Sequence, residues 1–298
     1  MNERFAELPT EQRNPRSEAL DSMSTVDMLR VINEADQEVA LAVSKVIPAI
    51  AEAVDVVAQS LSTGGRLRSF GAGTSGRIAV LDASEMHPTF GVPRDMIEGH
   101  MAGGKDAFFT PKEGAEDSEE EGEQMVADLA IGAADVVIGL AASGRTPFVL
   151  GVLREARRRG ARTIAITCAV PAPVLAAADI PIGVAVGPEV LTGSTRMKSG
   201  TAQKLVLNMI TTGAMVRMGL TYGNLMVAVT PTNEKLRARA LRIVEQITGR
   251  QKLDPRVLEA ANYDVRTACL MIELNLTAEE ARARLTAASG SLRRALRV

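Results

Sequence analysis

Residues 66–77 read RLRSFGAGTSGR, a short strand pattern that runs directly into a glycine-rich loop. The loop from Gly71 to Gly76 matches GxGxxG between a predicted strand at 66–70 and a predicted helix at 78–85. That arrangement opens many dinucleotide-binding α/β folds. Thr74 and Ser75 add hydroxyl groups, which suit a terminal phosphate better than a pyrophosphate that needs only bare backbone. The stretch therefore predicts an anion-binding strand–loop–helix unit.

The same alternation of strand and helix continues on both sides of this stretch. Further strands are predicted at 135–141, 163–168 and 180–186, with helices between them at 116–129 and 147–159. A longer helix is expected at 195–218. Strands that alternate with helices of this length form a parallel sheet with helices on both faces. The predicted fold class is therefore α/β.

The pattern also divides the chain into three parts. Residues 1–35 are polar and rich in turn formers, which indicates an ordered arm or short helices. Apolar residues then recur every three or four positions from Val39 to Leu61, as in an amphipathic helix that restarts near Pro48. Short helices at 255–261, 265–274 and 278–287 predict a small all-helical domain. The expected boundaries are 1–35, 36–248 and 249–298.

Composition excludes several functional classes. The 298 residues carry 34 Lys and Arg against 36 Asp and Glu, a balance that disfavours a general nucleic-acid binder. No apolar run long enough to span a bilayer and no secretory signal is evident, so neither membrane insertion nor export is expected. Cys168 and Cys269 lie far apart and the two histidines have no ligand spacing, which predicts a cytoplasmic protein without a metal site.

Three loops that carry hydroxyl groups stand at the start of predicted helices. Backbone N–H groups and the positive helix ends could together hold a phosphate dianion. The alternative is that each Ser or Thr only caps its helix. The predicted binding residues are Gly73, Thr74, Ser75 and Gly76 in the first loop, Ser143, Gly144 and Thr146 in the second, and Ser194, Thr195 and Arg196 in the third.

Charged residues near these loops are candidates for the chemistry. Arg77 and Arg145, like Arg196, stand beside a loop serine and could clamp a phosphate or form structural ion pairs. Glu85 has apolar neighbours that could raise its pKa and suit it to acid–base work. Glu116 opens an acidic run, which on residue type alone favours a solvated helix end. Glu189 is a weaker third candidate.

Taken together, these blocks resemble the N-acetylmuramic acid 6-phosphate etherases, a branch of the SIS phosphosugar-binding superfamily. The resemblance runs from about Thr10 to the C-terminus. Its blocks include Asn14-Pro15, residues 71–77, Asp82-Ala83-Ser84-Glu85, Gly114-Ala115-Glu116-Asp117, residues 141–147, Gly187-Pro188-Glu189-Val190 and Gly193-Ser194-Thr195-Arg196. It implies a SIS-type sheet and a homodimer that acts on a small phosphosugar without a cofactor or metal.

The resemblance also implies the reaction. The family removes the D-lactyl ether of its substrate by β-elimination and water addition, giving N-acetylglucosamine 6-phosphate and D-lactate. It assigns Glu85 as the acid that protonates departing lactate and Glu116 as the second acid–base residue. Met86-His87 replaces the Cys-Pro that usually follows the first glutamate, which changes the surroundings of that carboxylate.

Three other functions share the SIS loops. A non-catalytic phosphosugar sensor similar to the glucokinase regulatory protein is the main alternative, and it would bind the ligand without releasing lactate. An aldose–ketose isomerase would give a ketose instead. A transcription regulator is disfavoured because the arm is too short for a helix-turn-helix domain.

Overall fold

The computed structural model describes residues 8–110, 112–229, 231 and 233–297. Residues 1–7 of the predicted arm lie outside the described residues. The expectation that the N-terminus carries no secretory signal concerns these residues. Contacts between residues divide the chain into two compact units. The first comprises residues up to 83 together with 95–211, and the second comprises 84–94 and 212–298. No helix among the described residues combines the length and apolar character that crossing a membrane requires.

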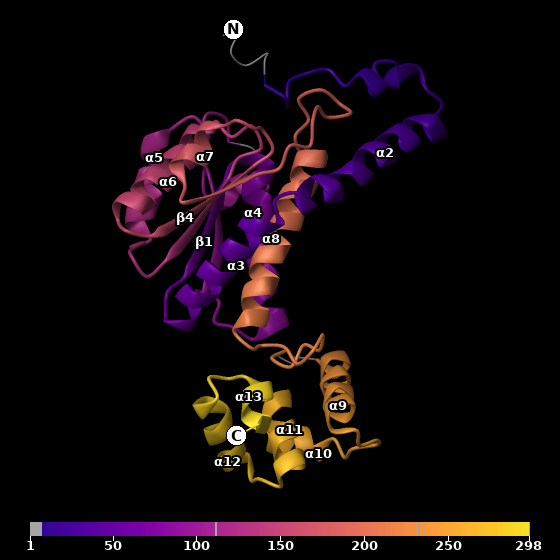
Figure 1. Ribbon diagram of the computed structural model, residues 1–298, viewed down its shortest axis with the longest axis vertical. Coiled ribbons are helices and arrows are strands. Elements are labelled where there is room, and N and C mark those ends of the chain that lie inside the picture. The colour runs from indigo at the N-terminus through magenta and orange to yellow at the C-terminus, as the bar shows by residue number, and fades with distance from the viewer. Residues whose placement is uncertain (1–7, 111, 230, 232, 298) are drawn as a thin grey trace. The chain divides into compact units, whose positions relative to one another are not determined.

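The first unit is built on a parallel sheet whose described strands run in the order β2-β1-β3-β4-β5 (Figure 1). The strands are β1 (Leu67–Gly71), β2 (Ile97–Met101), β3 (Val136–Leu140), β4 (Arg162–Thr167) and β5 (Ile180–Gly183). The central strands β1 and β3 are buried at every position, as expected for a sheet covered on both faces. The predicted α/β fold class is confirmed.

Strand β2 was not predicted, and its position explains why. It lies at the edge of the sheet, and only Ile97 and Met101 at its two ends are buried. Between them the chain reads Glu98-Gly99-His100, which lacks the apolar run that marks the inner strands. Glu98 pairs with the buried Arg68 of the neighbouring strand at 3.1 Å. A charged partner across the ladder therefore holds this strand where apolar burial does not.

Helices cover both faces of this sheet (Figure 1). One face carries α5 (Glu119–Asp128), α6 (Pro147–Arg158) and α7 (Pro173–Ala177), whose apolar side chains form a core with Phe70 and Val137. The other carries α3 (Ile47–Ser62), with α4 (Gly73–Phe90) and α8 (Lys198–Arg217) beside it. The first turn of α4 includes Gly73 to Gly76, which the sequence placed in a loop.

The N-terminal segment of the first unit contains two short 3-10 helices, η1 (Pro15–Ser17) and η2 (Leu20–Ser22). The long helix α2 (Thr25–Ser44) follows, and it begins well before the predicted start because the Ser24 hydroxyl caps it by accepting from the Asp27 N–H. The chain breaks at Lys45 and Val46 before α3, close to the restart predicted near Pro48.

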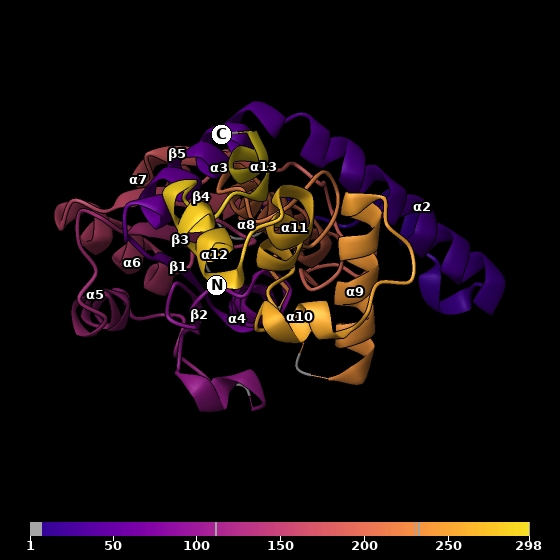
Figure 2. The same cartoon turned by 90° about the horizontal axis from the view of Figure 1, so that it is seen from below.

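The C-terminal part of the second unit is a cluster of helices (Figure 2). They are α9 (Glu234–Thr248), α10 (Arg256–Ala260), α11 (Val265–Leu274), α12 (Ala278–Ala287) and α13 (Leu292–Arg297). Helix α11 lies among the others and buries Val265 and Leu270 in their shared core. The small all-helical domain is confirmed, with α9 and α13 as additions to the three predicted helices.

Candidate active site

The direction in which the strands are added to the sheet reverses between β1 and β3. These neighbouring strands are parallel, and the chain leaves β1 toward β2 at one side and β3 toward β4 at the other. Ligands of such open sheets bind outside the carboxyl ends of the strands at this point of reversal. The first loop follows β1 and the second follows β3, so both predicted loops stand at the same edge of the sheet.

The first loop is held in a tight turn against helix α8. A Cβ at Gly76 would lie 2.6 Å from the Gly71 carbonyl oxygen, so this close approach requires glycine. The Ser75 hydroxyl donates to the Gln203 Oε1 atom at 2.9 Å, and both side chains are buried. Because that proton is committed to Gln203, Ser75 can offer an anion its backbone N–H. Thr74 is half-buried and Gly73 is exposed.

The second loop leaves its hydroxyl groups available. Thr146 precedes α6 in the capping position, yet its side chain makes no capping hydrogen bond. Ser143 accepts only a long contact of 3.4 Å from the Arg145 N–H. The capping alternative therefore does not account for Thr146. Its half-buried hydroxyl lies at the N-terminal end of α6, where the helix dipole favours an anion.

The third loop differs from the prediction at its helix end. Helix α8 begins at Lys198, and the Glu189 carboxylate accepts from the Lys198 and Ser199 N–H groups at 2.9 Å each. Glu189 is completely buried. This carboxylate already occupies the positive end of α8, so an anion there would meet a like charge. Any contribution of the third loop must come from Ser194, Thr195 and Arg196 themselves.

The carboxylate at the start of α8 has a buried cation beside it. Lys198 is 2% exposed, and its Nζ atom donates to the Val186 carbonyl at 2.6 Å. Burial lowers the pKa of Lys198, and the negative charge of Glu189 opposes that shift. Glu189, the weaker third candidate among the carboxylates, thus caps the N-terminal end of α8.

Contacts between α4 and α8 join the first and third loops. A Cβ at Gly200 would lie 3.5 Å from the Thr74 Cγ2 atom, so the first turns of the two helices touch. Further along, the Lys204 Nζ donates to the Asp82 carboxylate at 2.7 Å, with that carboxylate only 3% exposed. The packing at Gly200 and the Lys204–Asp82 ion pair hold α4 against α8, which places Thr74 near the residues that follow the third loop.

The two candidate glutamates fall in different units. Glu116 lies before α5, and its carbonyl accepts from the Phe148 N–H at 3.1 Å, which places it beside the second loop. Glu85 is on α4 in the second unit, where Met86 and Phe90 are buried. Both glutamates are exposed. Glu85 therefore does not share the burial of its apolar neighbours Met86 and Phe90.

The three arginines beside the loops differ in what their side chains contact. The Arg77 guanidinium donates to the Phe108 and Ala107 carbonyls at 2.8 and 3.0 Å, so it anchors the segment after β2. This outcome is neither the phosphate clamp nor the ion pair considered for it. Arg145 and Arg196 are exposed at the loops and remain the candidates for anion contact.

Similarities to known proteins bear on what this edge of the sheet binds. Residues 38–157 match the family described as Glucokinase regulatory protein N-terminal SIS domain, and residues 108–213 match the SIS domain. A protein from Pectobacterium atrosepticum named N-acetylmuramic acid 6-phosphate etherase is 53% identical over 97% of this chain and 96% of its own length. One of the same name from Symbiobacterium thermophilum is 53% identical over 89% and 88%.

A solved structure shares the fold at low identity. The phosphoheptose isomerase of Neisseria gonorrhoeae is 17% identical and superposes with a TM-score of 0.50. The match covers 64% of this chain and 98% of the isomerase. At this identity the similarity supports the architecture of the sheet and its helices.

Proposed function

The chain belongs to the N-acetylmuramic acid 6-phosphate etherases, and from this premise we propose which residues bind the phosphosugar and which catalyse the reaction. It is a lyase of cell-wall amino-sugar catabolism that cleaves the D-lactyl ether of its phosphosugar substrate. The observation that carries this conclusion is the 53% identity over nearly the whole length of both chains.

We assign the phosphate to the edge of the sheet where β1 and β3 end. The second loop supplies the available hydroxyl groups of Ser143 and Thr146, and the first supplies Thr74 and backbone N–H groups. Fixed donors of this kind hold the remote phosphate so that its binding energy can orient the sugar. The full proposed set is Gly73, Thr74, Ser75, Gly76, Ser143, Gly144, Thr146, Ser194, Thr195 and Arg196.

The carbon chemistry is assigned to the two glutamates. In the open-chain sugar the C1 aldehyde acidifies the C2 proton, and a carboxylate removes it. The electron pair forms the C2–C3 double bond as the C3–O bond breaks, and Glu85 protonates the departing lactate oxygen. Water then adds its oxygen to C3 and a proton to C2. Glu116 is the second acid–base group.

Isotopic labelling tests this sequence of steps. In water enriched in deuterium and oxygen-18, we expect the sugar product to gain deuterium at C2 and oxygen-18 at C3. Lactate should keep the unlabelled ether oxygen, because the C3–O bond is the one that breaks. Mass spectrometry of both products measures this. Label in the lactate oxygen with an unlabelled C3 hydroxyl would contradict elimination, and added N-acetylglucosamine 6-phosphate controls for later exchange.

The sensor alternative has one specific observation in its favour. Residues 38–157 match the N-terminal SIS domain of the glucokinase regulatory protein. A sensor would bind the phosphosugar without releasing lactate, so the lactate measurement above separates the two functions. An isomerase would give a ketose and is distinguished by the same products.

We further propose that the protein acts as a homodimer in the cytoplasm. Val26, Leu29 and Leu41 on α2 are 56%, 54% and 67% exposed. Within α2 the buried residues begin only at Ala35, and isolated helices are stabilised mainly by packing. A second copy packed on α2 would cover these side chains. The two free, buried cysteines fit a reducing compartment. The three-part division at residues 35 and 248 is retained as part of this proposal.

A charge placed on α2 tests the dimer. The double substitution Val26→Glu and Leu29→Glu is expected to weaken association roughly a hundredfold, because each buried carboxylate costs about 1.4 kcal/mol or more. Analytical ultracentrifugation at micromolar concentration measures the change. Phe109→Glu, at a side chain 85% exposed outside α2, is the matched control and should leave association unchanged. A double variant that sediments like the unaltered protein would contradict α2 as the interface.

A further inference from the structure

The N-terminal arm, defined here as residues 10–22, is hydrogen-bonded to the segment that leads into the third loop. Asn14 Nδ2 donates to the Pro188 carbonyl at 3.2 Å, and the Ser17 hydroxyl donates to the Val190 carbonyl at 2.7 Å. The Gly193 N–H donates to the Thr10 carbonyl at 3.2 Å. All three bonds join to backbone atoms of 188–193. The arm therefore fixes the path of this segment itself.

Asn14 and Ser17 are suited to this contact because both are buried. Their exposed fractions are 5% and 8%, so water does not replace a lost partner easily. Asn14 uses its two amide atoms separately, since Oδ1 accepts from the Arg16 N–H while Nδ2 reaches Pro188. The amide oxygen caps η1 and the amide nitrogen holds the loop segment.

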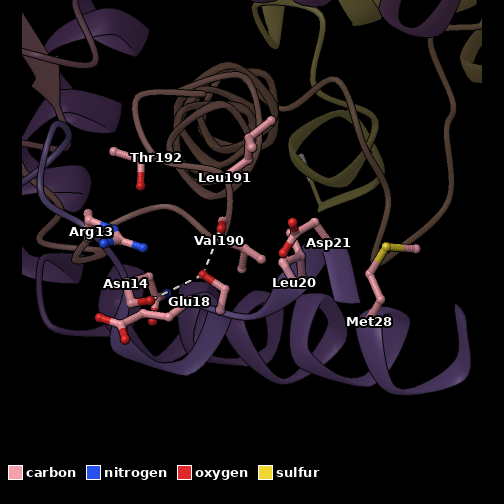
Figure 3. Close-up of a pocket in the computed structure, with 10 residues that line it drawn as sticks. Arg13, Asn14, Glu18, Leu20, Asp21, Met28, Val190, Leu191 and Thr192 are labelled. Carbon is pink, nitrogen blue, oxygen red and sulfur yellow. Dashed lines mark hydrogen bonds between the residues drawn. The ribbon is translucent and has the colours of Figure 1, made fainter. Parts of the chain in front are cut away.

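Little side-chain packing supports the outer side of this segment. A cavity of about 320 Å³ lies between the arm and residues 190–192 (Figure 3). Ser17 and Val190 both line this space, and the Ser17 hydroxyl donates to the Val190 carbonyl. Because side chains do not fill this space, residues 188–193 are held in place mainly by their hydrogen bonds to the arm.

The inner end of the same segment is already fixed. Glu189 holds the first N–H groups of α8, and the Met197 N–H donates to the Ser194 carbonyl at 3.2 Å. The arm is anchored in turn by Arg16, whose guanidinium donates to both oxygens of Glu38 at 2.8 and 3.0 Å. That hydrogen bond lowers the pKa of Glu38. The residues assigned to the phosphosugar, the half-buried Ser194 and Thr195 and the exposed Arg196, lie between these anchors.

We propose that Asn14 and Ser17 are positioning residues that hold Ser194, Thr195 and Arg196 in the binding arrangement. The inference rests on the proposed function, since it takes the third loop as part of the phosphosugar site. Without these bonds the loop occupies the competent arrangement only part of the time. Apparent affinity falls by that fraction, whereas the bound complex still reacts at its usual rate.

Two substitutions test this. Ser17→Ala removes the hydroxyl that donates to the Val190 carbonyl and, at 3.2 Å, to the Asn14 carbonyl within the arm. Asn14→Asp keeps the acceptor for the Arg16 N–H while replacing the donor to Pro188. Each is expected to raise KM about tenfold with kcat within twofold, which corresponds to about 1.4 kcal/mol, within the range for a lost buried hydrogen bond. Ser17→Thr should restore KM because it keeps the hydroxyl.

Controls separate positioning from a general loss of structure. Ser22→Ala removes an exposed hydroxyl bond to Ala19 on the same arm and should leave KM unchanged. Calorimetric binding of N-acetylglucosamine 6-phosphate needs no turnover, so it tests the positioning role even if lactate release fails. An unchanged dissociation constant in folded Ser17→Ala and Asn14→Asp proteins would overturn the proposal, as would a fall in kcat at constant KM.

Discussion

Glu85→Gln is expected to reduce lactate release by ~10²–10⁴-fold, the usual contribution of a positioned acid–base group. Glutamine keeps the shape of the side chain and its ability to accept hydrogen bonds, but it has no carboxylic acid proton to transfer. Lactate would then have to leave as a strongly basic alkoxide. Because we assign the phosphate to the loops and not to Glu85, the dissociation constant of N-acetylglucosamine 6-phosphate should stay within twofold.

The measurement pairs initial rates of lactate release with calorimetric binding of N-acetylglucosamine 6-phosphate. Glu52→Gln, at an exposed glutamate of α3, is the matched control and should retain full activity. Deuterium exchange at C2 adds a second readout. Exchange that persists in Glu85→Gln assigns removal of the C2 proton to Glu116, and exchange that is lost assigns it to Glu85. If Glu85→Gln keeps more than a tenth of the rate, Glu85 is not the acid.

The inner strands and the loops after them could be predicted because each carries its own local signal. A buried strand followed by glycine and hydroxyl residues can be predicted from a stretch of only twelve residues, as at 66–77. The edge strand β2 lacks that signal, since its middle residues are not buried and one of them, Glu98, forms an ion pair with Arg68. This ion pair forms because Arg68 of β1 lies opposite Glu98 of β2. The sequence alone does not show which residues of two strands lie opposite each other.

Contacts between distant segments explain what the sequence could not reveal about the site. Ser75 lies in a loop that the sequence predicts to bind phosphate, yet its hydroxyl donates to Gln203, which lies 128 positions away. Glu189 is one carboxylate among many in the sequence, and its role follows only once α8 begins nearby. The arm and the segment that leads into the third loop are joined by a hydrogen bond between Asn14 and Pro188, 174 positions apart. None of these pairs has a periodic or motif signature.

Gly144 lies in the second loop, where its backbone conformation and its close neighbours both oppose a side chain. Its φ of +68° is in the left-handed region, and its N–H donates to the Ala141 carbonyl at 3.0 Å. A Cβ there would lie 2.3 Å from the Ala172 Cβ and 2.7 Å from the Thr167 Oγ1. Real Cβ atoms do not approach other atoms so closely, so the loop must move.

The clash between a Cβ at residue 144 and Thr167 would also disturb the hydrogen bonds that hold the second loop. The Thr167 hydroxyl donates to the Ala142 carbonyl at 3.2 Å and accepts from the Ala169 N–H at 3.2 Å. Displacing it releases the backbone just before Ser143. Because Thr167 is completely buried, its groups would lose partners without gaining water.

Gly144→Ala is therefore expected to lower the free energy of unfolding by ~2–4 kcal/mol, combining left-handed strain with overpacking. The dissociation constant for N-acetylglucosamine 6-phosphate should rise at least about tenfold, since Ser143 and Thr146 move with the loop. Urea unfolding and calorimetry measure the two effects. Gly64→Ala shares the left-handed strain, at a φ of +89°, but its Cβ would meet no atom within 4 Å. Equal losses of binding in both variants would show that the second loop does not hold the phosphosugar.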